Sequence, residues 1–180
     1  MLYFKYLAIL LFIIIINLSC ESQEYKTGNN ENHKIHATKL AKDQMALWET
    51  GDTLKTHEIF ADSCTYEDVA NNQTFNGVNG VKKYISHVHN WVSDIKMKIR
   101  NLKISDDIGY VEWTFTAIQT SPIKGIVLIP TNKQIILNGV TLIKFRDDKI
   151  KDAKDYMDVL GFVLQLGSKV ELPGGVTLSK

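Results

Sequence analysis

The sequence has little cysteine and no excess of charge of either sign. Its 180 residues include two cysteines, Cys20 and Cys64, and 21 Lys and Arg residues against 20 Asp and Glu residues. Two cysteines cannot build a disulfide framework, and a chain near neutrality gives no electrostatic reason to expect nucleic acid as a partner. The length suits one compact domain with a segment or two outside it.

Signature motifs of several enzyme classes are also absent. We find no Gly-rich phosphate loop, no GxSxG nucleophile motif and no dinucleotide fingerprint. His87 and His89 lie two apart on an expected helix and therefore point in different directions, and no Cys or acid completes a ligand set with them. Cys64 has no His or Asn at a spacing typical of a nucleophile and is expected to be a small buried strand residue. We expect no metal and no cofactor.

The N-terminus carries an uninterrupted apolar run from Leu7 to Ile16, followed by Ser19 and Cys20. The run is shorter than the roughly 20 residues that span a bilayer as a helix, so residues 1–19 are expected to be a signal peptide. A cysteine after a small residue resembles a bacterial lipobox, although Asn17 stands where an aliphatic residue is usual. We expect a lipid on Cys20 and a location at the bacterial cell envelope; plain secretion and a retained anchor are the alternatives.

The remainder divides into three parts. Residues 20–34 are polar, rich in Asn and Glu and without hydrophobic period, which predicts a tether. Residues 35–167 alternate helix and strand patterns and are the expected domain. Residues 168–180 form a tail that either adds an edge strand or hangs free.

Hydrophobic periodicity predicts the elements of the domain. Helices are expected over 35–50, 53–60 and 81–91, a turn over 71–80, strands over 64–69, 95–104, 108–120, 134–145 and 149–157, and a long connection over 122–133. Asp52 can cap the second helix, and a phase slip at Arg100 and Asn101 predicts a β-bulge. Helices before a mostly antiparallel curved sheet are typical of an α+β fold, with the helices on one face of the sheet.

The last expected strand carries an acid on its apolar side. Side chains alternate across a strand, so Ala153, Asp155 and Met157 share one face. If this face points inward, burial disfavours the charged form of Asp155, as in groups that transfer protons. The alternative is structural: Asp155 would cap a helix beginning near Tyr156.

Three motifs carry a family resemblance that covers roughly residues 35–167. They are Tyr66-Glu67-Asp68 before a Gly-containing turn, Ile129-Pro130-Thr131-Asn132-Lys133 opening a strand, and Asp148-Lys149-Ile150 followed by Asp155-Tyr156-Met157-Asp158 and Gln165-Leu166-Gly167. In this order the chain resembles the SnoaL-like branch of the nuclear transport factor 2-like superfamily. The resemblance implies a cone, in which a curved sheet wraps around helices and leaves an apolar pocket open at one end.

The resemblance also implies roles for single residues. In SnoaL-like cyclases an Asp at a position like Asp155 moves a proton at the carbon next to a carbonyl. In the related limonene epoxide hydrolases Tyr66 and Asp155 would match a tyrosine and a late acid, and Asp68 stands where they have an asparagine. Their middle-strand Arg-x-Asp pair is replaced by Trp113 and Phe115, which argues against epoxide hydrolysis. The expected catalytic residues are Asp155, Tyr66 and Asp68, and the expected pocket residues are Trp113, Phe115 and Met157.

Two functions therefore remain open. One is a cofactor-independent isomerase, cyclase or hydrolase acting on a small apolar molecule through Asp155. The other is a non-catalytic module of the same fold that binds a ligand or a protein. The resemblance further implies a homodimer that pairs through its sheets, with Lys96, Lys98 and Arg100 on the face outside the pocket.

Overall fold

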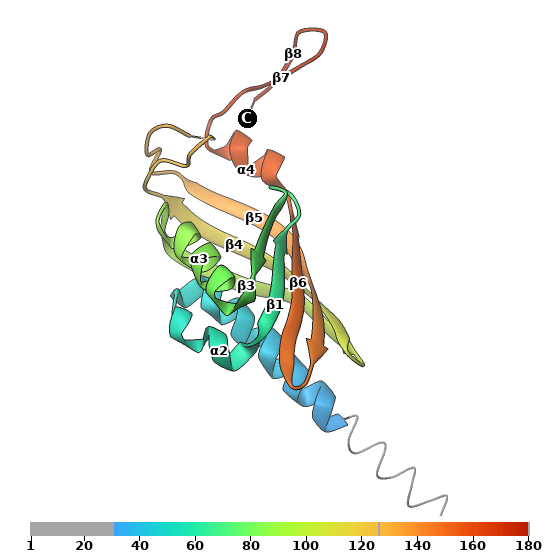
Figure 1. Ribbon diagram of the computed structural model, residues 1–180. Helices are drawn as coiled ribbons and strands as arrows, with labels where there is room; N and C mark the ends of the chain where they lie inside the picture. Colours follow the sequence, from blue (N-terminus) through green and yellow to red (C-terminus); the bar gives the residue numbers. More distant parts are fainter. Residues whose placement is uncertain (1–30, 126, 180) are drawn as a thin grey trace, which may run out of the picture.

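The computed structural model describes residues 31–125 and 127–179. A curved sheet wraps around two helices, one over residues 31–50 and the other α3 (Figure 1). In chain order the labelled elements are η1 (Thr53–Lys55), α2 (Thr56–Ile59), β1 (Phe60–Asp68), β2 (Gln73–Asn76), α3 (Gly77–His89), β3 (Val92–Ser105), β4 (Ile108–Gln119), β5 (Gln134–Arg146), β6 (Lys149–Met157), α4 (Val159–Gln165), β7 (Val170–Leu172) and β8 (Val176–Leu178). The expected α+β cone is confirmed.

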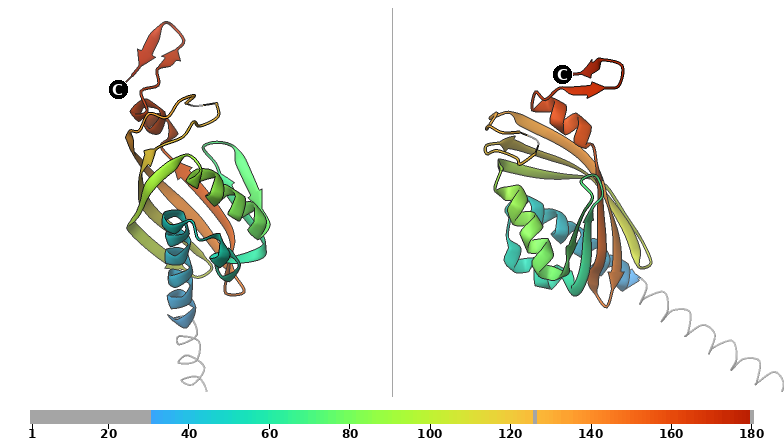
Figure 2. Two further views of the ribbon diagram at one scale, coloured as in Figure 1. Left: turned by 90° about the vertical axis from the view of Figure 1, so that its left-hand side faces the viewer. Right: turned by 45° about the horizontal axis from the view of Figure 1, so that its top comes forward.

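The main sheet has the strand order β2-β1-β6-β5-β4-β3. Each neighbouring pair is antiparallel except β1 and β6, which run parallel, so the first strand lies beside the last strand of the sheet along the chain. The pairing of β3 with β4 shifts between Ile99 and Asn101, which is the expected bulge. Figure 2 shows the concave side of the sheet occupied by the helices.

The two tight hairpins of the sheet follow from their turn residues. Asp106 joins β3 to β4 with φ 50°, and Asp147 and Asp148 join β5 to β6 with φ 51° and 55°. Asp tolerates this left-handed conformation better than most residues because its short side chain can hydrogen-bond locally. Both turns fall in the gaps between the expected strands, over 105–107 and 146–148.

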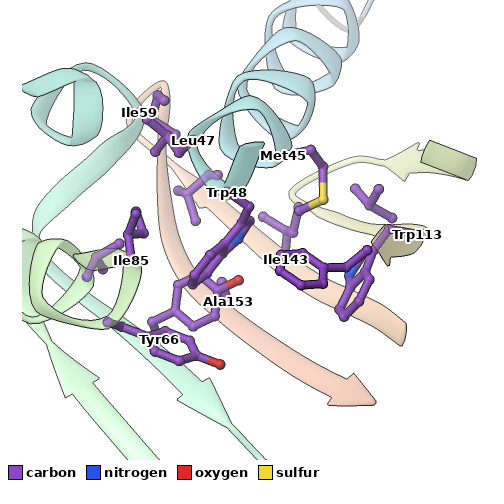
Figure 3. Close-up of a cluster of buried hydrophobic side chains, with 14 of the residues drawn as sticks. Met45, Leu47, Trp48, Ile59, Tyr66, Ile85, Trp113, Ile143 and Ala153 are labelled. Carbon is purple, nitrogen blue, oxygen red and sulfur yellow. The ribbon is translucent and has the colours of Figure 1, made fainter. Parts of the chain in front are cut away.

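The core joins the N-terminal helix to the inner face of the sheet. Figure 3 shows Trp48 of the helix beside Tyr66 of β1, and their ring centroids lie 5.8 Å apart at a steep angle. Tyr84 of α3 completes the group, with centroids 4.9 Å from Trp48 and 5.5 Å from Tyr66. Edge-to-face packing of this kind adds to the stabilisation from burying the rings.

The second and third helices begin and end at other residues than expected. The second helix ends before Phe60, which is buried and opens β1 opposite Ile150. The expected turn over 71–80 contains β2 and the start of α3. Pairing with β1 bonds one side of this short edge strand, and Phe75 stacks on Tyr84 with centroids 4.2 Å apart.

One end of the domain differs from expectation, and the other excludes one of the two alternatives left open for the tail. Residues 31–34, assigned to the tether, are helical, and the ring Nε2 of His33 lies 3.3 Å from the carbonyl oxygen of Asp106. The tail forms its own hairpin, β7 with β8, and joins no edge of the main sheet. Figure 2 shows this hairpin at the opposite end of the molecule from the start of the helix over residues 31–50.

The expected signal peptide, Cys20 and the tether up to residue 30 lie outside the described residues. Within the described part of the chain, no helix combines the length and the apolar character needed to cross a membrane.

Candidate functional site

A cavity lies between the inner face of the sheet, α3, α4 and the connection over 121–133. Its volume of about 170 Å³ far exceeds the roughly 15 Å³ that one water needs, so it can take a small molecule. Aromatic and aliphatic side chains form most of the wall: Trp48, Tyr84, Val88, Trp91, Met97, Trp113, Phe115, Ile123, Leu137, Met157, Val159 and Phe162. The polar lining residues are Asp68, Asn71, Gln73, His87, Lys124 and Asp155.

Asp155 is the buried acid of this cavity. It lies near the end of β6 on the inward parity and is 4% exposed. The Tyr66 hydroxyl donates to its Oδ2 at 2.9 Å, and the Thr141 hydroxyl donates to its Oδ1. Burial raises the pKa of Asp155 from 3.8 to about 7; the two hydroxyl bonds oppose this rise, and the charge of Asp68 adds to it. Near neutral pH the group can therefore both take and give a proton.

Thr141 and Trp113 support Asp155 from the neighbouring strands. Thr141 is fully buried opposite Asp155 in the pairing of β5 with β6. The indole Nε1 of Trp113 donates to the Thr141 hydroxyl oxygen at 2.8 Å. Because an indole N–H can only donate, Thr141 turns its own hydrogen toward Asp155.

Asp68 is the second buried acid, and its surroundings differ from those of Asp155. It is the partner of Asp155 in the parallel pairing of β1 with β6 and is 3% exposed. Three donors hold its carboxyl group: the backbone N–H of Asn71 at 3.1 Å, the Asn71 side-chain amide at 2.8 Å and the Tyr84 hydroxyl at 2.9 Å. The carboxyl group of Asp68 is thus held by three donor groups, and that of Asp155 by two hydroxyl groups.

Tyr66 stands behind Asp155 and does not line the cavity. Its ring is fully buried, and the side-chain amide of Gln44 donates to its hydroxyl oxygen at 3.0 Å. Burial, strengthened by the charge of Asp155, raises the pKa of Tyr66 well above its usual value, so the phenol keeps its hydrogen. Tyr66 therefore positions Asp155, whereas a role in direct contact with a ligand does not fit this geometry.

The structure places the other expected site residues together. Asp68, Trp113, Phe115, Met157 and Asp155 all line the one cavity. Trp113 and Asp155 are also linked through the hydroxyl group of Thr141.

Sequence reasoning missed two residues of the buried network, Gln44 and Thr141. Both carried a signal: Gln44 falls on the apolar stripe of its helix between Ala41 and Met45, and Thr141 falls on the inward parity of β5 with Ile143. A polar residue on a buried face needs a hydrogen-bond partner, and here both partners belong to the site.

Asp155 does not cap a helix. The last helix of the domain begins at Val159, and its cap is Asp158, whose Oδ1 accepts a hydrogen bond from the backbone N–H of Gly161 at 2.8 Å. Asp155 is three residues away and bonded to hydroxyl groups instead. It lines the cavity instead.

Fold and site together define a class: cone proteins in which a curved sheet encloses an apolar cavity with an acid in its wall. The profile of the SnoaL-like polyketide cyclase family matches residues 38–166, and the chain belongs to this family. The search of curated proteins found no match.

Solved structures agree on the fold. TsrD from Streptomyces laurentii superposes with a TM-score of 0.66 at 20% identity, covering 74% of this chain and 96% of that one. A SnoaL-like polyketide cyclase from Jannaschia sp. CCS1 gives 0.66 at 15% identity, with coverages of 74% and 92%. A limonene epoxide hydrolase-like enzyme from M. tuberculosis gives 0.58 at 16% identity, with coverages of 74% and 90%. At these identities the likeness is one of fold alone.

Proposed function

We propose that the protein binds a small, mostly apolar molecule in the cone cavity and uses Asp155 as general acid and base at a carbon next to a carbonyl. The observation that carries this is the position of Asp155: a buried acid in the wall of an apolar cavity, with a pKa of about 7. A group with this pKa is near the optimum for proton transfer at neutral pH, because neither of its forms is scarce. The reaction class is isomerisation or cyclisation, and it needs no cofactor.

Epoxide hydrolysis is supported less well. Trp113 and Phe115 occupy the middle-strand positions where limonene epoxide hydrolases have Arg and Asp. Neither replacement can polarise an epoxide, and the indole N–H of Trp113 is occupied by Thr141. The absence of this pair favours proton transfer by one acid.

A non-catalytic ligand-binding module is the second candidate. It is favoured by the same absence of the Arg-x-Asp pair and by the position of Tyr66, which does not line the cavity. In this case the hydrogen bonds to Asp155 stabilise the fold, and the cavity only holds its ligand.

The decisive experiment uses Asp155→Asn with Asp152→Asn as control. Asp152 lies on the same strand, but its side chain points to the opposite face of the sheet. The two variants therefore carry the same chemical change at positions inside and outside the cavity. The probe is β-tetralone, a flat ketone with acidic hydrogens next to its carbonyl, and NMR follows deuterium uptake at that carbon in heavy water.

We expect exchange with the wild type and with Asp152→Asn, and its loss in Asp155→Asn by at least ~100-fold. Mass spectrometry of molecules that co-purify with each variant measures binding separately. A protein that retains its ligand equally in all three forms but never accelerates exchange is the binding module.

The setting of the domain is also a proposal. A lipid on Cys20 would tether the cavity to the bacterial cell envelope, and loss of fatty-acid labelling in Cys20→Ser tests it. Secretion without a lipid is the alternative.

A homodimer through the outer face of the sheet is supported by the exposed apolar side chains of Ile136, Leu142 and Tyr156 there. Light scattering that finds only monomer rejects the dimer.

A further inference from the structure

We propose that Gln44 is a positioning residue whose side-chain amide turns over when Asp155 gains or loses its proton. An unpaired atom points to this role. The Oε1 of Gln44 is buried without a hydrogen-bond partner among the described residues, while Nε2 donates to Tyr66. Because no described residue bonds Oε1, only the contact of Nε2 fixes the orientation of the amide, and the amide can rotate to present Oε1 to the same hydroxyl.

One end of the network has a fixed direction. The indole N–H of Trp113 donates to Thr141, and Thr141 therefore donates to Oδ1 of Asp155. Because that hydrogen already occupies Oδ1, a proton carried by Asp155 belongs on Oδ2. This is the oxygen that lies 2.9 Å from the Tyr66 hydroxyl.

The other end can reverse. With Asp155 ionised, Oδ2 accepts from Tyr66, and Tyr66 accepts from Nε2 of Gln44. With Asp155 protonated, Oδ2 donates to Tyr66, which must then send its own hydrogen elsewhere. The side chains of Gln44 and Trp48 both lie at the Tyr66 hydroxyl, but an indole can only donate. A half-turn of the Gln44 amide presents Oε1 as the acceptor. The hydrogens of Tyr66 and Asp155 are then paired in both states.

The neighbouring titratable groups do not interrupt this network. Asp68 is held by Asn71 and Tyr84, and burial raises the pKa of Tyr84 well above its usual value, so Tyr84 remains a donor as Asp155 titrates. His87 and Lys124 line the cavity and make no bond to Gln44 or Tyr66. The reversal is therefore confined to Gln44, Tyr66 and Asp155.

This reversal gives Asp155 a hydrogen bond with Tyr66 in both its ionised and its protonated form. Its importance for catalysis rests on the proposed function, but the reversal itself is measurable without a substrate. NMR of the purified protein, with labels in the Gln side-chain amides and Asp carboxyl groups, follows Gln44 and Asp155 from about pH 4 to 9. We expect the Gln44 amide signals to titrate with the midpoint of Asp155, and the contacts of its amide hydrogens with the Tyr66 ring to be lost at low pH.

Asp155→Asn supplies an independent test, because its amide can donate to Tyr66 as the protonated acid does. This variant should show the low-pH pattern of Gln44 at every pH. An amide spectrum of Gln44 that is the same at both ends of the titration, or a high-pH pattern in Asp155→Asn, overturns the proposal.

Two further variants separate a reversing amide from a fixed donor. Gln44→Met fills similar space without a hydrogen-bonding group. When Asp155 is protonated in this variant, the Tyr66 hydrogen has no acceptor, so the proton affinity of Asp155 should fall about tenfold or more. A fixed donor predicts the opposite sign, because its loss weakens support for the ionised acid. Thr141→Val is the control: it removes a donor from the carboxylate and should raise the proton affinity. Absence of turnover alongside these shifts would count against the proposed function and leave the reversal intact.

Discussion

The indole of Trp113 lies against Gly139, in the space that a β-carbon would occupy. A β-carbon built on Gly139 would come within 2.5 Å of two carbons of the ring and 2.8 Å of the Tyr156 carbonyl oxygen. The two residues are paired on β4 and β5, so the missing side chain lets the indole reach Thr141. Glycine at this position is thus part of the support for Asp155.

Gly139→Ala should therefore disturb the site as well as the packing. Because the ring must move, we expect a loss of about 1–3 kcal/mol in the free energy of unfolding and weaker bonding of Trp113 to Thr141. Chemical denaturation and the fluorescence of the indole measure the two effects. Lys144→Ala is the comparison, because Lys144 is exposed on the outer face of the same strand, where loss of the side chain disturbs no packing. Equal losses in both variants would contradict the packing explanation.

The stability of the protein should fall as pH rises from about 4 to 7. Burial raises the pKa of Asp155 from 3.8 to about 7 in the folded state. Between these pH values the folded state binds one proton more than the unfolded state, so the free energy of unfolding falls as the pH rises and this proton is released. The full effect is about 4 kcal/mol. Asp155→Asn carries no titrating group and should remove this slope, making the variant relatively more stable at pH 8 than at pH 4. Denaturation curves across pH check this, and an unchanged slope would show that another group is responsible.

Removing the charge of Asp68 should lower the pKa of Asp155. The two acids are partners on neighbouring parallel strands, and the charge of Asp68 disfavours ionisation of Asp155. In Asp68→Asn the carboxyl NMR titration of Asp155 should shift to lower pH. Tyr84→Phe removes a hydrogen bond to Asp68 but keeps the charge, so it should shift the midpoint less. A shift to higher pH in Asp68→Asn would contradict this electrostatic coupling.

The last helix of the domain should depend on Asp158. Its side chain caps α4, and Gln165 at the other end of the helix bonds both the N–H and the C=O of Ile136 at 2.8 Å. Asp158→Ala should cost about 1 kcal/mol and speed hydrogen exchange in α4, whereas Asp158→Asn keeps an accepting oxygen and should cost less. Because Val159 and Phe162 line the cavity, a loosened α4 should also weaken ligand binding. Unchanged exchange in the alanine variant would rule out the cap.

Much of the architecture could be predicted because it depends on local pattern. The alternation around Asp155 placed it on the inward face of β6, and the gaps between the expected strands fall at the two Asp-containing hairpin turns. The bulge between Ile99 and Asn101 showed itself as a slip in the period. Where the local pattern was weak, at β2, the prediction of a turn was wrong, and in the tail it left two alternatives open, since pairing with another strand decides the structure of such short segments.

The sequence by itself determined which faces of the strands and helices are apolar, because burial of a side chain follows from its period and its chemistry. Only the tertiary structure decided that β1 runs parallel to β6, which sets Asp68 beside Asp155 and Tyr66 behind it. It also brought Gln44 and Thr141 to the buried acid from distant parts of the chain. Strand order and buried hydrogen bonds are settled by how all the faces are buried together, and no local stretch of sequence contains that information.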